Sequence, residues 1–460
     1  MDAPAEIFRE YDIRGLVEQQ LTPELAYHLG RAVGTRIVAE GGSSAVVGRD
    51  HRESGEALAD AVARGLSECG LAVSEIGITP TPVGYWAIHH LEAGGGLHVT
   101  GSHNPPEYNG FKITLRSGPV YGDDIRALRA RIVAEDYASG TGARRDVPVL
   151  DAYLDALAEN LEAATTPLKV VVDAGNGTAG LTAVPLYERL GHSVVPLYCE
   201  PDPEFPNHHP DPTVEENLDD LKRAVDAHGA QLGLAFDGDG DRVGVIDADG
   251  SVVWGDRLLI LLAREVLREQ PGAAIIGEVK CSKALYDDIE QHGGRAIMWR
   301  AGHSLIKAKM KAESAALAGE MSGHIFYQHR YYGFDDAVYA GGRLLEVLAR
   351  HTATVGELLS DVPEWVATPE IRMECPEAIK FELVRRVAES FKAQAQQEGF
   401  RVVDIDGARL EWEDGWGLVR PSNTQPLLVL RFEAKTQARV DAIRERMMGE
   451  INRLRHQLEQ

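Results

Sequence analysis

Three stretches of this chain repeat one order of apolar runs and helical patterns. Each opens with a short run rich in β-branched residues, at 45–48, 169–173 and 274–277. A helical pattern follows, then a second apolar run, at 73–76, 193–197 and 295–299. A third apolar run closes each unit, at 97–99, 232–236 and 315–318. Such alternation predicts mainly parallel sheets with helices on both faces.

The pattern changes from about Pro363. A long amphipathic stretch at 378–397 leads into further strands and a polar loop at 420–426. A chain of 460 residues exceeds one hydrophobic core. We therefore predict an α/β protein with three related mixed-sheet α/β domains, at 1–147, 148–250 and 251–362. A smaller α+β domain at 363–460 is expected to complete a central cleft, with linkers at 139–147 and 361–369.

Composition narrows the partners and the compartment. The formal net charge of −24 argues against binding to nucleic acid or to an anionic membrane. Four scattered cysteines without metal-ligand spacing indicate reduced thiols in a cytosolic protein. The first residues lack a signal-peptide pattern, and no apolar stretch is long enough to span a bilayer. We expect a cytoplasmic monomer that acts on small molecules.

Three aspartates at alternate positions follow the apolar run at 232–236. Asp237, Asp239 and Asp241 would repel one another unless a divalent cation lay among them, and hard cations such as Mg²⁺ prefer oxygen ligands. Arg242 comes next, and its rigid fork of donors suits phosphate. A metal beside a phosphate-binding arginine indicates phosphoryl chemistry.

Two other metal or phosphate folds share parts of this pattern. An EF-hand needs glycine at its sixth position and glutamate at its twelfth, where this chain has Arg242 and Ala248. A haloacid-dehalogenase-like phosphatase would use Asp237 as nucleophile and Asp239 as acid. That family usually has Thr or Val at the position of Asp241, which makes it a poor match.

The third apolar runs of the other two repeats, at 97–99 and 315–318, also lead into polar loops. Residues 100–105 place Ser102 beside His103, which suits a nucleophilic or phosphate-carrying serine. No Gly-x-Ser-x-Gly elbow of an α/β-hydrolase occurs in the chain. Lys112 is close enough in sequence to reach back into the serine loop across a hairpin. Ligands of open α/β sheets bind where strands end, so the three loops are expected to line one cleft.

The loops at 319–324 and 420–424 suit a phosphorylated sugar. Glu320, Ser322 and His324 stand at alternate positions, so an extended loop would turn them to one face towards hydroxyl groups. Arg420 with the hydroxyl and amide residues after it can wrap a phosphate.

A dinucleotide-binding fingerprint is a competing interpretation. Residues 175–180 match Gly-x-Gly-x-x-Gly after a strand, and Glu200 ends the next strand. A nicotinamide-dependent dehydrogenase therefore remains an alternative on local evidence. Such a domain would lie in mid-chain and would leave the aspartates and the other polar loops unexplained.

Together the four loops resemble those of the phosphohexomutase superfamily, most closely its bacterial phosphomannomutase/phosphoglucomutase branch. The resemblance covers essentially the whole chain, with a phosphoserine loop at 100–105, a metal loop at 237–242, a sugar loop at 319–324 and a phosphate loop at 420–424. Phosphoglucosamine mutases typically carry Gln at the position of Met321 and Gly at that of Asn423. A mutase for aminosugar phosphates and a non-catalytic phosphosugar-binding regulator remain alternatives.

The resemblance implies reversible phosphoryl transfer between the 1- and 6-positions of glucose and mannose phosphates. It implies a phosphoserine at Ser102 and a hexose 1,6-bisphosphate that serves as intermediate and activator. The implied Mg²⁺ ligands are Ser102, Asp237, Asp239 and Asp241. The implied catalytic residues are Ser102, Lys112, Arg14, His303 and Arg242. The implied substrate-binding residues are Tyr11, His103, Lys280, Glu320, Ser322, His324, Arg420, Ser422, Asn423 and Thr424.

Overall fold

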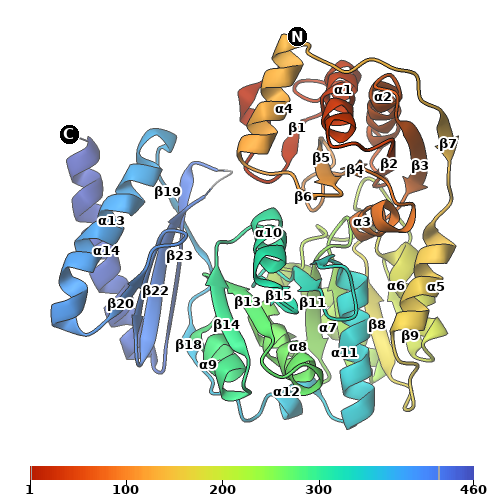
Figure 1. Cartoon of the computed structure of the whole chain (residues 1–460). Coiled ribbons are helices and arrows are strands. Elements are labelled where there is room, and N and C mark those ends of the chain that lie inside the picture. Colours follow the sequence, from red (N-terminus) through yellow and green to blue (C-terminus); the bar gives the residue numbers. More distant parts are fainter. Residues whose placement is uncertain (2, 423–424, 460) are drawn as a thin grey trace.

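Four sheets organise the part of the chain that the computed structural model describes, which is residues 1, 3–422 and 425–459. Figure 1 shows the first sheet at the upper right and the next two side by side below it. The fourth sheet and its two long helices form a separate lobe at the left. This is an α/β fold of three related units followed by a smaller α+β unit.

The first sheet has the strand order β1-β5-β4-β2-β3-β7, with β6 paired to β5. Its strands are β1 (Ile13–Leu16), β2 (Ser44–Arg49), β3 (Ala72–Ile78), β4 (Gly95–Val99), β5 (Tyr108–Leu115), β6 (Gly118–Pro119) and β7 (Arg144–Asp146). Its helices are η1 (Ala5–Ile7), α1 (Pro23–Ala39), α2 (Gly55–Ser67), α3 (Thr81–His90) and α4 (Asp123–Ala134). Strand β7 pairs in parallel with β3, so the segment interpreted as a linker at 139–147 contains an edge strand.

The second sheet has the order β12-β11-β10-β8-β9. Its strands are β8 (Lys169–Asp173), β9 (Ser193–Leu197), β10 (Leu232–Phe236), β11 (Val243–Asp247) and β12 (Val252–Val253). Its helices are α5 (Leu150–Asn160), α6 (Gly180–Arg189), η2 (Glu215–Leu218) and α7 (Asp219–His228).

The third sheet has the order β14-β13-β15-β16-β17. Its strands are β13 (Ala274–Glu278), β14 (Arg295–Trp299), β15 (Leu317–Gly319), β16 (Ile325–Tyr327) and β17 (Phe334–Asp335). Its helices are α8 (Gly255–Glu269), α9 (Lys283–Gln291), α10 (His303–Glu313), α11 (Ala337–His351) and α12 (Val355–Leu358).

All three sheets share one internal arrangement. The first strand of each repeat lies between the second and the third, and all three strands run parallel. An antiparallel strand then pairs with the third, as β5 does with β4, β11 with β10 and β16 with β15. Each predicted functional loop therefore connects two neighbouring antiparallel strands, and the pairing of these strands fixes both ends of the loop.

The C-terminal unit has its own antiparallel sheet of order β18-β23-β22-β21-β20, with β19 paired to β23. Its strands are β18 (Val366–Ala367), β19 (Ile371–Glu374), β20 (Arg401–Val403), β21 (Ala408–Trp412), β22 (Gly415–Pro421) and β23 (Leu427–Ala434). Its helices are α13 (Glu377–Glu398) and α14 (Gln437–Glu459). Strand β18 lies inside the second predicted linker and joins this sheet.

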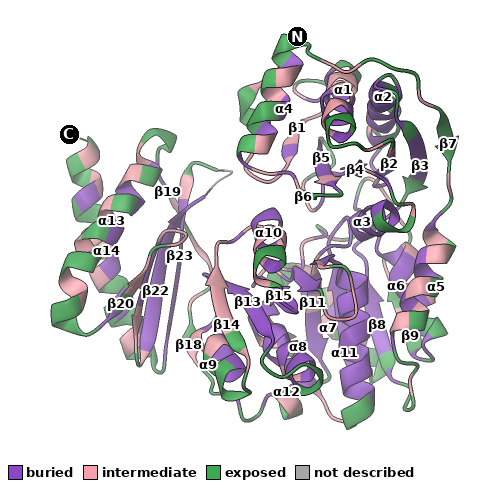
Figure 2. Cartoon of the chain, in the orientation of Figure 1, coloured by how far each residue is buried: buried purple, intermediate pink, exposed green. Residues whose placement is uncertain are grey.

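Apolar packing joins the first three units more closely than the fourth. One core cluster runs from Val46 and Trp86 in the first unit through the second unit to Leu348 in the third. The C-terminal unit has a separate core between its sheet and its two helices. Figure 2 shows α8 and α11 largely buried, whereas α13 and α14 carry exposed residues along their outer faces.

Among the described residues, no helix combines the length and the apolar character needed to cross a membrane.

A buried histidine on β4 makes stability depend on pH. His98 is 2% exposed and packs against Gly48 and Gly84, where an added Cβ would lie 2.7 and 2.9 Å from its Nδ1. Burial lowers the pKa of His98 from 6.5 to about 4. Below pH 6.5 the unfolded chain takes up a proton that the folded chain does not bind until about pH 4. The free energy of unfolding should therefore fall by about 3 kcal/mol across this window.

Urea denaturation of the wild type and of His98→Asn between pH 7 and pH 4 checks this expectation. Acid-sensitive groups that do not interact with His98 contribute equally to both proteins, so the difference between them reports on His98 and on its effect on its neighbour Asp239. The free energy of unfolding of the wild type minus that of His98→Asn should decrease as the pH falls. A difference that stays constant over this range would contradict it.

Candidate active site

The connection between β4 and β5 holds Ser102 in a constrained backbone conformation. Its φ of 50° lies in the left-handed region, which residues other than glycine rarely occupy. The Ser102 amide donates to Thr100 Oγ1 at 2.8 Å, and the residue is 2% exposed. Backbone outliers cluster at functional sites, where the surrounding structure maintains the strain.

The Ser102 hydroxyl lies against the aspartate loop, although 135 residues separate it from Asp237. Its Oγ donates to Asp237 Oδ2 at 2.9 Å and lies 3.1 Å from His103 Nδ1. Arg14 reaches the same loop, because its Nη1 donates to Asn104 Oδ1 at 3.4 Å. The fold thus brings together the serine, His103, Arg14 and the first of the three aspartates.

Asp237, Asp239 and Asp241 form a fully buried carboxylate group. Asp237 Oδ1 accepts the backbone N–H groups of Asp241 at 3.0 Å and Arg242 at 3.2 Å, which closes the loop on itself. The Oδ2 atoms of Asp239 and Asp241 accept from Lys112 Nζ at 2.6 and 2.5 Å. Their Oδ1 atoms are buried without a hydrogen-bond partner among the described residues.

The negative charge of these three aspartates favours binding of a cation. Burial, and then the carboxylates of Asp239 and Asp241, raise the pKa of Asp237 well above its ordinary value. Burial would also raise the pKa of Asp239, but Lys112 outweighs it and lowers that pKa. The two positive charges of Lys112 and Arg242 do not fully offset three carboxylates, and one oxygen from each aspartate lies within 4.8 Å of the others. These donors fit a divalent metal ion.

A second set of ligand-type atoms lies nearby, on Asp241, His324 and Asp335. Lys307 Nζ lies 2.9 Å from Asp335 Oδ1, and His324 Nδ1 lies 3.0 Å from Asp335 Oδ2. The ammonium of Lys307 already balances the charge of Asp335. The three aspartates at 237–241 are therefore the better cation site.

Lys112 on β5 contacts the aspartate loop, not the serine loop that its place in the sequence suggested. Burial lowers the pKa of Lys112, but the carboxylates of Asp239 and Asp241 outweigh it and raise the pKa well above its ordinary value. The side chain therefore carries a positive charge near neutral pH. This suits charge stabilisation better than proton acceptance.

The connection between β15 and β16 brings Glu320, Ser322 and His324 together. The Ser322 hydroxyl donates to Glu320 Oε2 at 3.5 Å, and His324 Nε2 lies 4.0 Å from that oxygen. Glu320 Oε1 accepts from the Gly302 amide at 2.6 Å. This bond ties the loop to the start of α10, whose first residue is His303.

Two imidazoles stack beside the aspartates. The rings of His303 and His324 have centroids 5.7 Å apart. Burial, and then Lys307, lower the pKa of His303 well below its ordinary value, so this ring is neutral. Arg242 Nε donates to His324 Nε2 at 2.9 Å, which links the arginine after the aspartates to the loop at 319–324.

Arg420 of the C-terminal unit meets the third unit through Asp406. Its Nε donates to Asp406 Oδ2 at 3.0 Å, and the same oxygen accepts from the Ala301 amide at 3.1 Å. The Tyr11 hydroxyl donates to the Ala301 carbonyl at 3.0 Å. Residues from the first, third and fourth units therefore converge at the N-terminus of α10.

The remaining predicted residues have more local contacts. Lys280 Nζ lies 3.4 Å from Glu370 Oε2, and Ser422 Oγ accepts from the Gln425 amide at 3.1 Å. Neither contact reaches Ser102. Asn423 and Thr424 lie outside the described residues.

Sequence reasoning missed several residues that shape the site. Asp50 and Arg52 follow β2 directly and contact the serine loop, so the rule that ligands bind at strand ends could have found them. Asp335 is the last residue of β17, so it also stands where a strand ends. Asp406 stands in an Asp-Gly turn, which is too common a pattern to signal function.

The glycines at 175–180 support the aspartate loop. An added Cβ on Gly177 would lie 2.7 Å from the Gly238 carbonyl, which accepts from the Thr178 amide at 3.1 Å. This close backbone packing accounts for the glycine at 177. The contacts thus favour a supporting role over a dinucleotide pocket.

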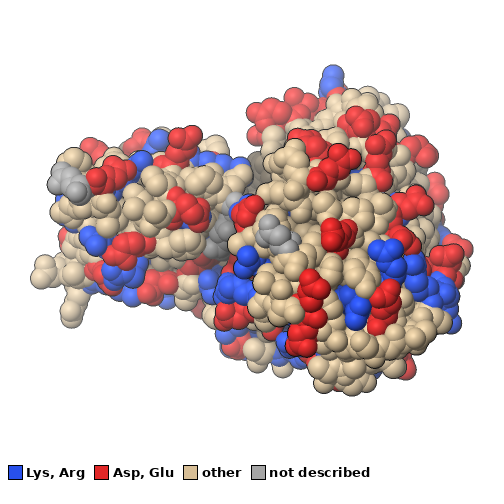
Figure 3. Space-filling view, turned by 90° about the horizontal axis from the view of Figure 1, so that it is seen from above, with Lys and Arg blue, Asp and Glu red and all other residues tan. Residues whose placement is uncertain are grey.

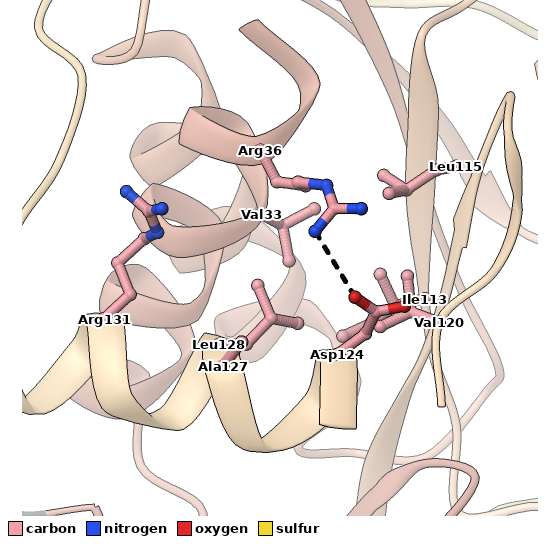
Figure 4. A pocket seen from close by; sticks show the side chains of 9 residues that line it. All are labelled: Val33, Arg36, Ile113, Leu115, Val120, Asp124, Ala127, Leu128 and Arg131. Carbon is pink, nitrogen blue, oxygen red and sulfur yellow. Dashed lines mark hydrogen bonds and ion pairs between the residues drawn. The ribbon is translucent and has the colours of Figure 1, made fainter. Parts of the chain in front are cut away.

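The small pocket drawn in Figure 4 is separate from these residues. It lies between α1, α4 and β5, with Val33, Ile113 and Leu128 in its wall. Arg36 crosses it and donates to Asp124 Oδ1 at 3.3 Å. Its lining contains none of the predicted site residues that the structure describes.

Basic side chains near the aspartates lie inside the protein, although the chain as a whole is acidic. Figure 3 shows acidic side chains spread over the face seen from above. Several basic groups of the site are instead buried, among them Lys112, Arg52 and Arg420. Each of these three groups pairs with an aspartate, and charges inside a protein are less screened than charges on its surface.

Family models for the four domains of phosphoglucomutase/phosphomannomutase match the chain in order. Alpha/beta/alpha domains I, II and III match residues 5–139, 151–250 and 254–365, and the C-terminal domain matches 370–450. A phosphomannomutase/phosphoglucomutase of Pseudomonas aeruginosa is 49% identical over 96% of this chain and 94% of its own length. One of Pseudomonas putida is 46% identical over 99% and 97%. The crystal structure of a family protein from Burkholderia thailandensis superposes with a TM-score of 0.92, at 44% identity and 98% coverage of both chains.

Proposed function

Because the chain belongs to the phosphoglucomutase/phosphomannomutase family, we propose that it is a mutase that moves a phosphoryl group between the 1- and 6-positions of hexose phosphates. We propose glucose and mannose phosphates as its substrates and Ser102 as the residue that carries the group. One observation supports this assignment above the others. The Ser102 hydroxyl contacts Asp237 at 2.9 Å and so lies at the edge of the buried aspartates.

The aspartates would hold Mg²⁺ together with an oxygen of the phosphorylated Ser102. Such an ion would neutralise charge on the transferring group. The unpartnered Oδ1 atoms of Asp239 and Asp241 support this role, because a buried carboxylate oxygen without a donor is costly.

The residues around Ser102 suit transfer in both directions. In the first half-reaction the bond between Ser102 Oγ and phosphorus breaks, and a bond from phosphorus to a sugar hydroxyl oxygen forms. In the second half-reaction a bond from phosphorus to a sugar oxygen breaks, and the bond to Ser102 Oγ forms again. Arg14 and His103 lie at the serine loop, and Lys112 adds a fixed charge beside the aspartates. The neutral imidazole of His303 is the group available to hold the proton that leaves the attacking hydroxyl, whereas His324 Nε2 already accepts from Arg242.

Substrate recognition must accept a hexose in two opposed poses. Glu320 and Ser322 would bind hydroxyl groups present in either pose, with Tyr11 and Lys280 near the same region. Arg420 and Ser422 would hold the phosphate that does not react. The C-terminal unit has its own core, so we expect it to move as a body while the bisphosphate turns end over end.

Replacing Arg420 by lysine should weaken substrate binding more than it alters serine phosphorylation. Lysine keeps a charge near Asp406 but loses the fork that fits a phosphate. We expect KM for glucose 1-phosphate to rise about 10-fold or more, since a charge-assisted hydrogen bond contributes about 1.5–3 kcal/mol.

Steady-state kinetics and intact mass give the two readouts for this variant. Arg385→Lys, on the exposed face of α13, is the control and should behave as the wild type. An unchanged KM in Arg420→Lys would contradict the proposal that Arg420 binds the phosphate that does not react.

The proposed function is tested with freshly purified protein, Mg²⁺ and catalytic glucose 1,6-bisphosphate. Glucose 1-phosphate and mannose 1-phosphate should both be converted to the 6-phosphates. Peptide mapping should find one phosphate, on Ser102. Faster conversion of glucosamine 6-phosphate than of either hexose phosphate would favour the aminosugar alternative, and binding without conversion would favour a regulator.

The cytoplasmic location and the monomeric state stay predictions from the sequence. The thiols of Cys69, Cys199, Cys281 and Cys375 are all free, which is compatible with a reducing compartment.

A further inference from the structure

We propose that Arg52 is the positioning residue of the serine loop and that Asp50 holds it in place. In this proposal Arg52 does not contact the substrate. It fixes the backbone conformation of the loop that places Ser102 beside the aspartates. The inference rests on the proposed function, because it concerns how the phosphorylated serine is presented.

Four N–H groups of Arg52 bind backbone carbonyl groups of the loop. Nη2 donates to the carbonyl oxygens of Ser102 at 2.9 Å and Asn104 at 2.6 Å. Nη1 donates to those of Pro105 at 2.7 Å and Tyr108 at 3.0 Å. One planar group thereby fixes the loop from its serine to the first residue of β5.

The fifth N–H group joins Arg52 to Asp50. Nε donates to Asp50 Oδ2 at 3.2 Å, so all five donors of the guanidinium are used. The same oxygen accepts from the Gly101 amide at 3.1 Å, and Asp50 Oδ1 accepts from the Arg52 amide at 3.0 Å. Asp50 therefore orients the guanidinium and fixes the residue that precedes the serine.

Both residues are buried, which makes their geometry rigid. Arg52 and Asp50 are 2% and 1% exposed. An added Cβ on Gly101 would lie 2.5 Å from Arg52 Nε, so the loop touches the guanidinium. Phe205 lies nearby, with its ring centroid 5.3 Å from Arg52 Cζ, in reach of a cation–π contact. A buried pair with every donor satisfied specifies one arrangement of its partners.

This arrangement bears directly on phosphoryl transfer. Carbonyl oxygens carry partial negative charge and would repel a phosphate on Ser102. Arg52 binds the Ser102 carbonyl while the hydroxyl of the same residue faces Asp237. The interaction thus holds the left-handed conformation of Ser102 and directs carbonyl oxygens of the loop to the guanidinium.

Lysine at position 52 cannot replace these contacts, because an ammonium has three donors and no fork. In Arg52→Lys we expect kcat for glucose 1-phosphate to fall about 100-fold, since a displacement of about 1 Å at a reacting group has an effect of that size. KM should stay within about threefold, because Glu320 and Arg420 are untouched. Phosphorylation of Ser102 by added glucose 1,6-bisphosphate, followed by intact mass, should slow in parallel.

Asp50→Asn is the second variant. It keeps the size of the side chain and removes its charge, and we expect an intermediate loss in kcat, about 10-fold, with the same KM. Arg64→Lys, at an exposed position on α2, is the control and should leave kcat unchanged. Circular dichroism and thermal unfolding give the folded fraction, and kcat is expressed per folded molecule.

The outcomes separate the two proposals. A wild type without turnover and without phosphate on Ser102 would overturn the proposed function. An active wild type with both variants within twofold of its kcat per folded molecule would overturn the role of Arg52. A fall in kcat matched by an equal rise in KM would also overturn it. If Arg52→Lys does not fold, Asp50→Asn decides the question by the same criteria.

Discussion

Replacement of Ser102 by alanine should reduce turnover of glucose 1-phosphate by at least about 1,000-fold, because the variant lacks the atom that carries the phosphoryl group. The variant should also lose the phosphate that intact mass detects on the wild type. The neighbouring groups remain, since Asp237 keeps its bonds to the amides of Asp241 and Arg242. Substrate binding should therefore persist while conversion stops.

Ser102→Gly separates chemistry from folding. Ser102 has a φ of 50°, which glycine adopts at no steric cost, so this variant should be at least as thermally stable as Ser102→Ala. Both should be equally inactive. Turnover close to that of the wild type in either variant would refute the phosphoserine.

Removal of the divalent cation should have the second large effect. Treatment with a chelator should abolish most turnover, and adding Mg²⁺ should restore it. Mg²⁺ should also raise the unfolding temperature by a few degrees, because a ligand at about 100 times its Kd stabilises the folded state by about 2.7 kcal/mol. This thermal shift does not depend on an activity assay.

Two aspartate variants show whether the shift comes from the predicted site. Asp239→Asn removes one charge from the buried group and should lose most of the thermal response to Mg²⁺. Asp249→Asn changes an acid in the turn that follows β11 and should keep the full response. An equal response in the two variants would place the cation elsewhere.

Protons and the cation compete for these carboxylates. Burial, and then the neighbouring aspartates, raise the pKa of Asp237, so a proton binds there more tightly than to an ordinary aspartate. The concentration of Mg²⁺ needed for half of the thermal response should therefore increase as the pH falls.

The strands were the most predictable part of the fold. The runs at 169–173, 193–197 and 295–299 match β8, β9 and β14 residue for residue, because valine, isoleucine and other apolar residues stand between turn-forming ones. The antiparallel strands after each functional loop were harder to place. Their pairing depends on which edge of the sheet is free, and local residues do not encode that.

Lys112 shows the limit of reasoning from sequence spacing. It stands ten residues after Ser102, which suggested contact with the serine loop. Antiparallel pairing places Lys112 opposite His98 on β4, and its ammonium reaches Asp239 and Asp241 from another unit. Arg52 is a similar case, because only the folded chain brings four loop carbonyls within reach of one guanidinium.

The sequence by itself determined the repeated strand-and-helix units, the chemical kinds of the polar loops and the family, because these follow from residue type at short range. Tertiary structure alone decided which loops meet and what each charged group faces. Ser102 and Asp237 become neighbours because two separate sheets pack together. The physical reason is that burial and charge balance depend on all sides of a group, and most of those sides come from distant parts of the chain.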